Sequence, residues 1–234
     1  MEPLVIPIIF GAMLIQSLAG FGSALIAMPF LIALLGPEVA RPLFVLVGQT
    51  AGILYLYQYR ADWQIPDIKL LIVGTLLGIP FGTWIAYSLS QEMFMLVLGI
   101  IIMVYALYNL SGFKLKQISA RWAPIFGFCS GILHSAYNVG GPPLVMYNAS
   151  QTWKARRFKG NTQAVFFITG MFVIIEHVRT GHVTAPVIQH YLIMAPTMIL
   201  ALWLGFRLEK YIQQATFQKL VMALLLMIGI SLVL

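Results

Sequence analysis

Charged side chains are scarce in this chain of 234 residues, since Asp, Glu, Lys and Arg together make up only 9% of it. Soluble domains carry about 25% charged residues. Hydrophobic residues make up 60%, and the mean hydropathy is +0.90, which is more apolar surface than a small soluble domain can bury. The composition predicts an integral membrane protein, and it excludes a cytosolic enzyme, a disulfide-stabilised secreted domain and a disordered chain.

Cysteine and acidic residues are also rare. The single cysteine, Cys129, excludes an internal disulfide and a metal site built from several cysteines. The seven acidic residues lie at the ends of apolar segments or between them, so we expect no buried carboxylate of the type that couples many carriers to protons. The chain has no P-loop sequence, which excludes ATP hydrolysis by this chain. Its basic residues are scattered through short gaps, so nucleic acid is not an expected partner.

Six apolar segments are long enough to cross a membrane, which takes about 20 residues in a helix. They lie at about 40–58, 67–88, 92–110, 160–177, 184–206 and 216–234. Two further apolar regions, about 4–35 and 124–150, are interrupted by Gly20-Phe21-Gly22 and by Asn138-Val139-Gly140-Gly141-Pro142-Pro143. Glycine and proline in such runs do not continue a helix. We therefore expect each of these regions to be a re-entrant helical hairpin, which enters the membrane and returns to the same side.

The positions of Lys and Arg favour hairpins over single broken crossings. With hairpins, the gaps at 59–69, 111–123, 151–159 and 207–219 are all cytoplasmic, and they hold every basic residue except Arg41 and Arg179. With broken crossings, the basic residues would be divided almost evenly between the two sides. Because Lys and Arg concentrate in cytoplasmic loops, the hairpin arrangement is the prediction, and it places both termini in the periplasm.

An internal repeat follows from this arrangement. Residues 1–110 and 124–234 each become one hairpin plus three spans, joined by a cytoplasmic linker at 111–123. Because three crossings are an odd number, the two repeats have inverted topology, as in many secondary transporters. A shift of about 118 residues aligns the halves, and it pairs Gln16 with His134, Ser17 with Ser135, Gly22 with Gly140, Arg41 with Lys159 and Gly52 with Gly170.

The two interruptions resemble the signature motifs of a known family. Ser17-Leu18-Ala19-Gly20-Phe21-Gly22-Ser23-Ala24, followed by Pro29, is similar to the first signature of the TauE/SafE (TSUP) family of sulfite and organosulfonate transporters. Gly127-Phe128-Cys129-Ser130-Gly131, followed by the run from Asn138 to Leu144 and by Lys159, is similar to the second. The resemblance implies a carrier of small sulfur-containing anions in the bacterial inner membrane, not an enzyme.

The hairpin tips are the candidate anion site. A helix begins after each tip, near Ser23 and near Pro142, and a helix N-terminus offers unpaired N–H groups and a partial positive charge. Polar residues within apolar stretches usually face a cavity or the protein interior. The candidate substrate-binding residues are Gln16, Gly20, Gly22, Ser23, Gln49, His134, Asn138, Gly140, Gly141, Asn161 and Gln163. Arg41 and Lys159 would attract the anion at the two mouths of the pathway.

Each of these features also has a purely structural interpretation. Glycines permit close helix packing, polar residues form hydrogen bonds between helices, and basic residues anchor helix ends at the interface. The predicted function is a secondary carrier of a sulfur oxyanion or sulfonate with no bound cofactor or metal. Coupling to protons, with His134 as a carrier of the proton, coupling to sodium, and a homodimer are left open. The alternatives are an anion channel, a membrane sulfur-transfer enzyme that uses Cys129, and a subunit that does not transport.

Overall fold

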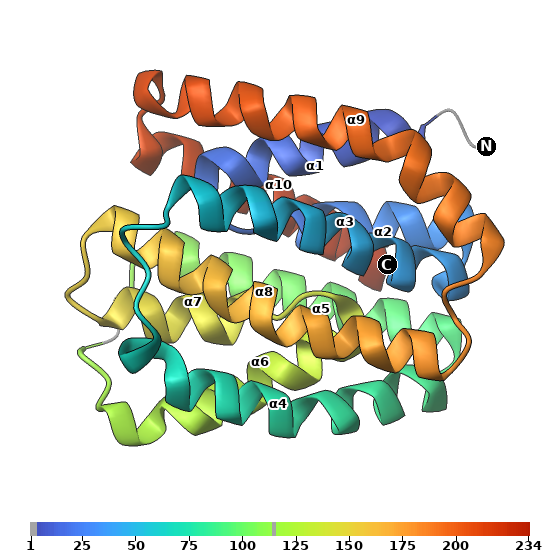
Figure 1. The fold of residues 1–234 in the computed structure, drawn as a ribbon, viewed down its shortest axis with the longest axis horizontal. Helices are drawn as coiled ribbons and strands as arrows, with labels where there is room; N and C mark the ends of the chain where they lie inside the picture. Colours follow the sequence, from blue (N-terminus) through green and yellow to red (C-terminus); the bar gives the residue numbers. More distant parts are fainter. Residues whose placement is uncertain (1–3, 114–115) are drawn as a thin grey trace. The chain divides into compact units, whose positions relative to one another are not determined.

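The computed structural model describes residues 4–113 and 116–234, and all regular secondary structure in those residues is helical. Lys114 of the predicted linker and residues 1–3 of the predicted N-terminal repeat lie outside the described residues. The first half of the chain forms α1 (Val5–Ala19), α2 (Ser23–Leu35), α3 (Pro37–Gln58), α4 (Ile65–Ser88) and α5 (Gln91–Leu110). The second half forms η1 (Ala120–Trp122), α6 (Ala123–Tyr137), α7 (Gly141–Ser150), α8 (Ala155–Arg179), α9 (Ala185–Leu208), η2 (Glu209–Tyr211) and α10 (Gln214–Val233) (Figure 1).

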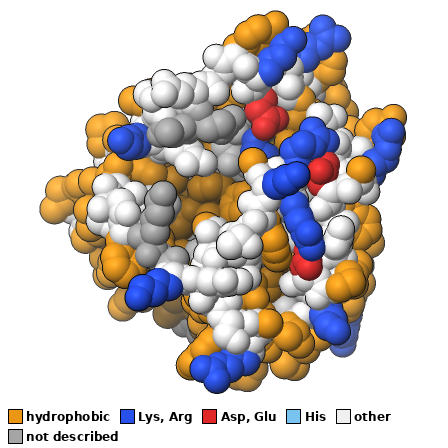
Figure 2. Space-filling model, turned by 90° about the vertical axis from the view of Figure 1, so that its left-hand side faces the viewer, with side chains coloured by type: hydrophobic (Ala, Val, Ile, Leu, Met, Phe, Trp, Pro, Cys, Tyr) orange, Lys and Arg blue, Asp and Glu red, His pale blue; other side chains and the backbone are white. Residues whose placement is uncertain are grey.

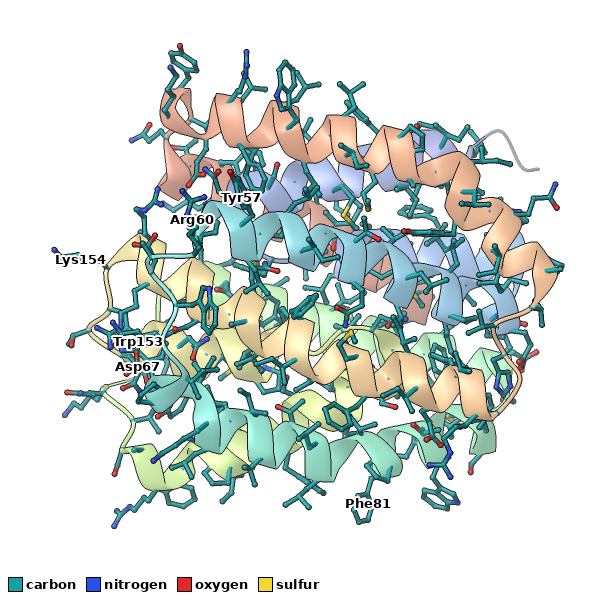
Figure 3. All side chains as sticks on the ribbon, viewed as in Figure 1. Tyr57, Arg60, Asp67, Phe81, Trp153 and Lys154 are labelled. Carbon is teal, nitrogen blue, oxygen red and sulfur yellow. The ribbon has the colours of Figure 1, made fainter. Side chains whose placement is uncertain are left out.

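Six of these helices, α3, α4, α5, α8, α9 and α10, are long and apolar enough to cross a membrane. They are the six predicted spans, and the largest shift of an end is at α8, which begins at Ala155. Large apolar side chains such as Leu77 and Phe81 are exposed along α4, and Phe81 points away from the helices in Figure 3. Apolar surface of this extent is stable only against lipid or another apolar partner. The prediction of an all-helical membrane protein is confirmed.

The two interrupted regions form pairs of short helices, α1 with α2 and α6 with α7, and the members of each pair pack against each other. The first pair breaks at Gly20-Phe21-Gly22, which we call the first tip. The second breaks at Asn138-Val139-Gly140, which together with Gly141 at the start of α7 we call the second tip. The return of each pair to one side of a membrane and the inverted topology of the repeats stay predictions.

The helices group into two compact units. Unit 1 comprises Met1–Leu43, Leu89–Phe113 and Thr184–Leu234, and unit 2 comprises Phe44–Ser88 and Lys114–Val183. Unit 1 therefore holds α1, α2, the beginning of α3, α5, α9 and α10, whereas unit 2 holds the rest of α3 with α4, α6, α7 and α8. Each unit takes helices from both halves of the sequence, and each contains one tip.

In unit 2, glycines bring α4 and α6 into contact along much of their length. Gly74, Gly78 and Gly82 of α4 face backbone atoms of α6, while Gly127 and Gly131 of α6 face backbone atoms of α4. At each of these five positions a β-carbon would overlap the backbone of the other helix. Small residues at such spacing let membrane helices approach closely, and Cα–H groups then contact carbonyl oxygens. The packing holds α6, and with it the second tip, against α4.

Unit 1 pairs its helices differently. α1 packs against α9, and α5 packs against α10. At the first contact, Gly205 of α9 lies against the side chain of Ser17. At the second, Gly99 of α5 and Gly229 of α10 face each other, and a β-carbon on either glycine would crowd both side-chain and backbone atoms of the other helix. At Gly205, the helix that carries the first tip therefore meets α9 through a side chain.

Candidate functional site

The first tip is built by two glycines with positive φ. Gly20 ends α1 at φ 87°, with its N–H donating to the carbonyl of Gln16 at 2.7 Å, and Gly22 precedes α2 at φ 102°. Side chains with a β-carbon rarely adopt such angles, so the turn requires glycine there. The hydroxyl of Ser23 donates to Oε1 of Gln16, and both side chains are buried. This bond joins the two helices across the tip and leaves the amide NH₂ of Gln16 as its remaining polar group.

The N-terminus of α2 keeps its hydrogen-bond donors. The helix's own hydrogen bonds begin with the N–H of Ile26, which donates to the carbonyl of Gly22 at 3.3 Å. The N–H groups of Ser23, Ala24 and Leu25 in the first turn are therefore not used by the helix itself. A β-carbon at Gly22 would meet no atom within 4 Å, so open space lies beside this turn.

The second tip reaches a similar turn by other means. Asn138 has φ 57°, and its N–H donates to the carbonyl of His134 at 2.9 Å. Gly140 has an ordinary φ of −69°, but a β-carbon there would lie 2.8 Å from Cβ of His134 and 3.0 Å from the carbonyl oxygen of Ser130. The hydroxyl of Ser130 donates to the carbonyl of Gly140 at 2.7 Å. Glycine is required here by close approach and not by backbone angle.

The N-terminus of α7 has fewer donors than that of α2. Its first three residues are Gly141, Pro142 and Pro143, and proline has no N–H. Only the N–H of Gly141 remains in the first turn, although the partial positive charge of the helix end persists. Gly141 is buried, yet a β-carbon there would meet no atom within 4 Å. Open space therefore adjoins a buried helix N-terminus.

His134 and Gln49 form a buried polar group beside the second tip. Nε2 of Gln49 donates to the carbonyl of Phe167 at 3.0 Å, and a β-carbon on Gly170 would touch this amide and lie 3.6 Å from Cε1 of His134. Nδ1 of His134 lies 3.4 Å from Oγ1 of Thr169. Because His134 also lies against Gly140, the structure brings three predicted residues, Gln49, His134 and Gly140, together in unit 2.

Two contacts between α3 and α8 are related by the repeat. A β-carbon on Gly52 would lie 2.9 Å from Phe167, and one on Gly170 would touch Gln49. Gln49 and Phe167 are 118 positions apart, and so are Gly52 and Gly170. The shift that aligns the two halves therefore exchanges these two contacts with each other. A two-fold relation between the repeats would produce such an exchange, and the inverted topology of the repeats stays a prediction.

Asn161 lies in another group of unit 2 and does not join the tip. Its Oδ1 accepts the N–H of Gln64 at 2.8 Å, and its Nδ2 donates to Asp67 at 3.1 Å. Arg157 pairs with Asp67 at 2.5 Å, and Arg156 pairs with Asp62 at 2.9 Å. The network fastens the α3–α4 connection to the start of α8.

The labelled residues Arg60, Asp67, Trp153 and Lys154 mark the end of the molecule where this network lies (Figure 3). Figure 2 looks onto that end and shows acidic side chains lying among Lys and Arg side chains. In this network, Arg156 and Arg157 form the ion pairs with Asp62 and Asp67. Asn161 acts here as a structural connector between a loop and a helix.

The two predicted pathway-mouth cations are both buried. Arg41 is 4% exposed in unit 1, where its guanidinium lies 4.2 Å from the centre of the Phe94 ring. Lys159 is 6% exposed in unit 2. Interface anchors keep their charged ends in water, so burial argues against simple anchoring. Gln163 is 2% exposed on α8.

Cys129 does not form a nucleophilic site with His134. The cysteine is exposed on α6, whereas His134 is buried against Gly140 and Thr169. Five positions along a helix separate the two side chains by about 140° around its axis, so they face different directions. Among the described residues, no group of three or more His, Cys, Asp or Glu side chains could hold a metal ion.

Sequence reasoning missed several polar residues and the helix interface. Thr169 beside His134, Ser130 at Gly140, and the pair Thr83 and Ser135, whose hydroxyls lie 2.5 Å apart, are ordinary residues in apolar helices. The glycine interface did have a signal. Gly74, Gly78 and Gly82 are spaced by four, as are Gly127 and Gly131, and this spacing is typical of close membrane-helix packing.

Comparison with known proteins agrees with the sequence motifs. The family model for the sulfite exporter TauE/SafE matches residues 5–232. A protein of Cupriavidus necator named probable sulfite/organosulfonate exporter TauE is 24% identical over 230 residues, which cover 94% of this chain and 88% of that protein. No solved structure matches the chain. With a family match over nearly its whole length, the chain belongs to the sulfite exporter TauE/SafE family, and it is a multi-pass membrane transporter rather than an enzyme.

Proposed function

We propose that this chain is a secondary transporter that moves a small sulfur oxyanion, of the sulfite or organosulfonate class, across the bacterial inner membrane. The observation that carries the proposal is that both tips combine a helix N-terminus with adjoining open space. The name of the Cupriavidus necator relative supports the substrate class. The positions of Lys and Arg support periplasmic termini.

The chemistry of the tips suits an oxyanion. Its oxygens accept several hydrogen bonds at once, and the first turn of α2 offers the N–H groups of Ser23, Ala24 and Leu25. Helix ends attract anions through the same groups and through the helix dipole. None of the tip residues is Lys or Arg, so the tips can bind an anion without holding it as tightly as a fixed cation would.

The repeat supports a carrier that alternates between two states. Related contacts between α3 and α8 surround Gly52 and Gly170, and an equivalent exchange pairs α1 with α9 and α6 with α4. In transporters with inverted repeats, rocking of one repeat against the other converts a state that is open to one side of the membrane into a state that is open to the other side. A channel would not need to convert between two such states. Saturable counterflow therefore distinguishes the proposed carrier from an anion channel.

The test is counterflow of labelled sulfite in liposomes, with methanesulfonate, sulfate and thiosulfate as competitors. Gly141→Leu fills the open space beside α7 without meeting another atom at its β-carbon. The matched control is Gly11→Leu, at a glycine of α1 that also has open space around it. We expect saturable exchange that is lost in Gly141→Leu and retained in Gly11→Leu. Exchange that is absent for every sulfur anion, or lost equally in both variants, would contradict the proposal.

A further inference from the structure

Among the buried polar atoms without a hydrogen-bond partner in the described part of the chain is Oε1 of Gln49. The side chain is 8% exposed. Its orientation is set by the bond from Nε2 to the carbonyl of Phe167, because a carbonyl can only accept. The atom left over is therefore an acceptor. An unpaired buried acceptor destabilises the folded protein, so a bound donor would relieve a penalty that the protein now carries.

This acceptor lies in the region that the proposed function uses. The amide of Gln49 touches the position of Gly170, Cε1 of His134 is close to the same position, and His134 lies against Gly140 of the second tip. These contacts form one continuous group within unit 2. The unpaired carbonyl oxygen of Gln49 and the second tip therefore belong to the same group of contacting residues.

The polar groups of this region are unusual for an anion site. Pro142 and Pro143 remove two of the three N–H groups that the first turn of α7 would otherwise supply. Gln49 presents an oxygen where an anion would call for a donor. A fully deprotonated oxyanion would place acceptor against acceptor at this point, which is repulsive. An anion that carries its own donor would not.

We infer that the transported form of sulfite is its protonated monoanion, hydrogensulfite, whose O–H donates to Oε1 of Gln49. This inference rests on the proposed function and specifies its substrate. The sulfite dianion and the sulfonate head group have acceptor oxygens only. Hydrogensulfite has a donor as well as acceptors. Its single O–H can donate to Gln49 while its other oxygens accept hydrogen bonds. The second proton of sulfurous acid is lost near neutral pH, so acidity controls the supply of this form.

The effect of protonating the ligand must be distinguished from the titration of protein side chains near Gln49. His134 of α6 is the ionisable side chain that faces it, and Tyr137 follows one turn later. On α8, Lys159 lies about three turns and His177 about two turns from Gly170. On α4, Asp67 lies in the first turn and Lys69 follows it. His134 is therefore the group whose titration could imitate the predicted behaviour.

The experiment measures counterflow of labelled sulfite at pH 6 and pH 8, at one total sulfite concentration, with protein-free liposomes as background. We expect exchange at least about fivefold faster at pH 6, because a group that titrates near neutrality loses most of its protonated form across this interval. Gln49→Met should bring the ratio of the two rates close to one. His134→Gln should slow exchange at both pH values and keep the ratio.

A second measurement does not depend on how the variants fold. Sulfite should raise the thermal unfolding temperature of the wild-type protein in detergent more at pH 6 than at pH 8, because a ligand that binds the folded state more tightly stabilises it more at the same concentration. An equal or larger shift at pH 8 would overturn the inference. So would a pH ratio that persists in Gln49→Met, or one that vanishes in His134→Gln, which would assign the proton to the protein.

Organic sulfonates test whether the group that donates to Gln49 is the O–H of hydrogensulfite or another donor. If 2-aminoethanesulfonate exchanged faster than sulfite and depended on Gln49, the donor would be an ammonium group, and the inference would be wrong while the proposed function stood. If methanesulfonate showed the same pH ratio as sulfite, the titrating group would again belong to the protein. Absence of sulfite exchange at both pH values would contradict the proposed function itself.

Discussion

The two tips occupy equivalent positions in the repeat but offer opposite hydrogen-bonding groups. In unit 1, Ser23 uses the oxygen of Gln16 and leaves its NH₂, beside a helix end with all three N–H groups. In unit 2, Phe167 uses the NH₂ of Gln49 and leaves its oxygen, beside a helix end with two prolines. The first tip is rich in donors and the second presents an acceptor. The two tips therefore share a helix break followed by a new helix N-terminus, but they differ in the hydrogen-bonding groups that they offer.

The tips also use glycine for different reasons. Gly22 needs its freedom to adopt a φ of 102° and has space around it, whereas Gly140 has an ordinary φ and no space. The helices behind them differ in the same way. α6 is held against α4 by glycines that meet backbone, and α1 meets α9 through Gly205 and the side chain of Ser17. The following substitutions test these contrasts.

The largest expected effect is at the helix interfaces. Gly131→Ala should destabilise the protein by about 3 kcal/mol, because its β-carbon would overlap the carbonyl of Thr75, and no change of a neighbouring side chain can relieve a clash with backbone. Gly205→Ala should also destabilise, but Ser17→Gly should restore much of the loss by removing the obstructing side chain.

Denaturant unfolding in detergent, analysed as a double-mutant cycle, measures the difference between the two interfaces. Ser17→Gly alone is the control. If Ser17→Gly failed to rescue Gly205→Ala, the two interfaces would not differ in the way described.

A smaller effect is expected at the tips, where the order of tolerated residues should reverse. At Gly22, Asn should cost less than Ala, because Asn tolerates positive φ better and space is open; the strain on Ala is about 1–2 kcal/mol. At Gly140, Ala should cost less than Asn, because every added atom crowds His134 and Ser130. Thermal unfolding of the four variants gives the order, and the same order at both tips would contradict the distinction.

The smallest effect is expected at Asn161. Asn161→Ala removes the bonds to Gln64 and Asp67 and should cost about 1–2 kcal/mol. The concentration of sulfite at half-maximal exchange should not change, because the group lies apart from the second tip. Counterflow and unfolding are measured on the same preparation, with Gly141→Leu as the variant that alters transport. A raised half-maximal concentration with normal stability would return Asn161 to the binding site.

The sequence predicted the helices well because apolar length and glycine or proline breaks act locally. All six spans and both interruptions lie where hydropathy and Gly20-Phe21-Gly22 or Asn138 to Pro143 indicated. Partners were less predictable. Asn161 and Gln49 look alike in the sequence, yet one bonds to a loop far along the chain and the other keeps an unpaired oxygen. Which polar residue meets which depends on how distant helices pack, and the apolar pattern carries little of that information.

The interleaved units have a consequence for biosynthesis. α4 is completed well before α6 is synthesised, so the glycine face of α4 has no partner while the first half leaves the ribosome. α1 must likewise wait for α9. Neither half contains a whole unit. The first helices therefore enter the membrane long before the helices that they pack against have been synthesised. Residues 1–110 expressed alone should be inserted but remain protease-sensitive, and co-expression with residues 111–234 should protect both fragments.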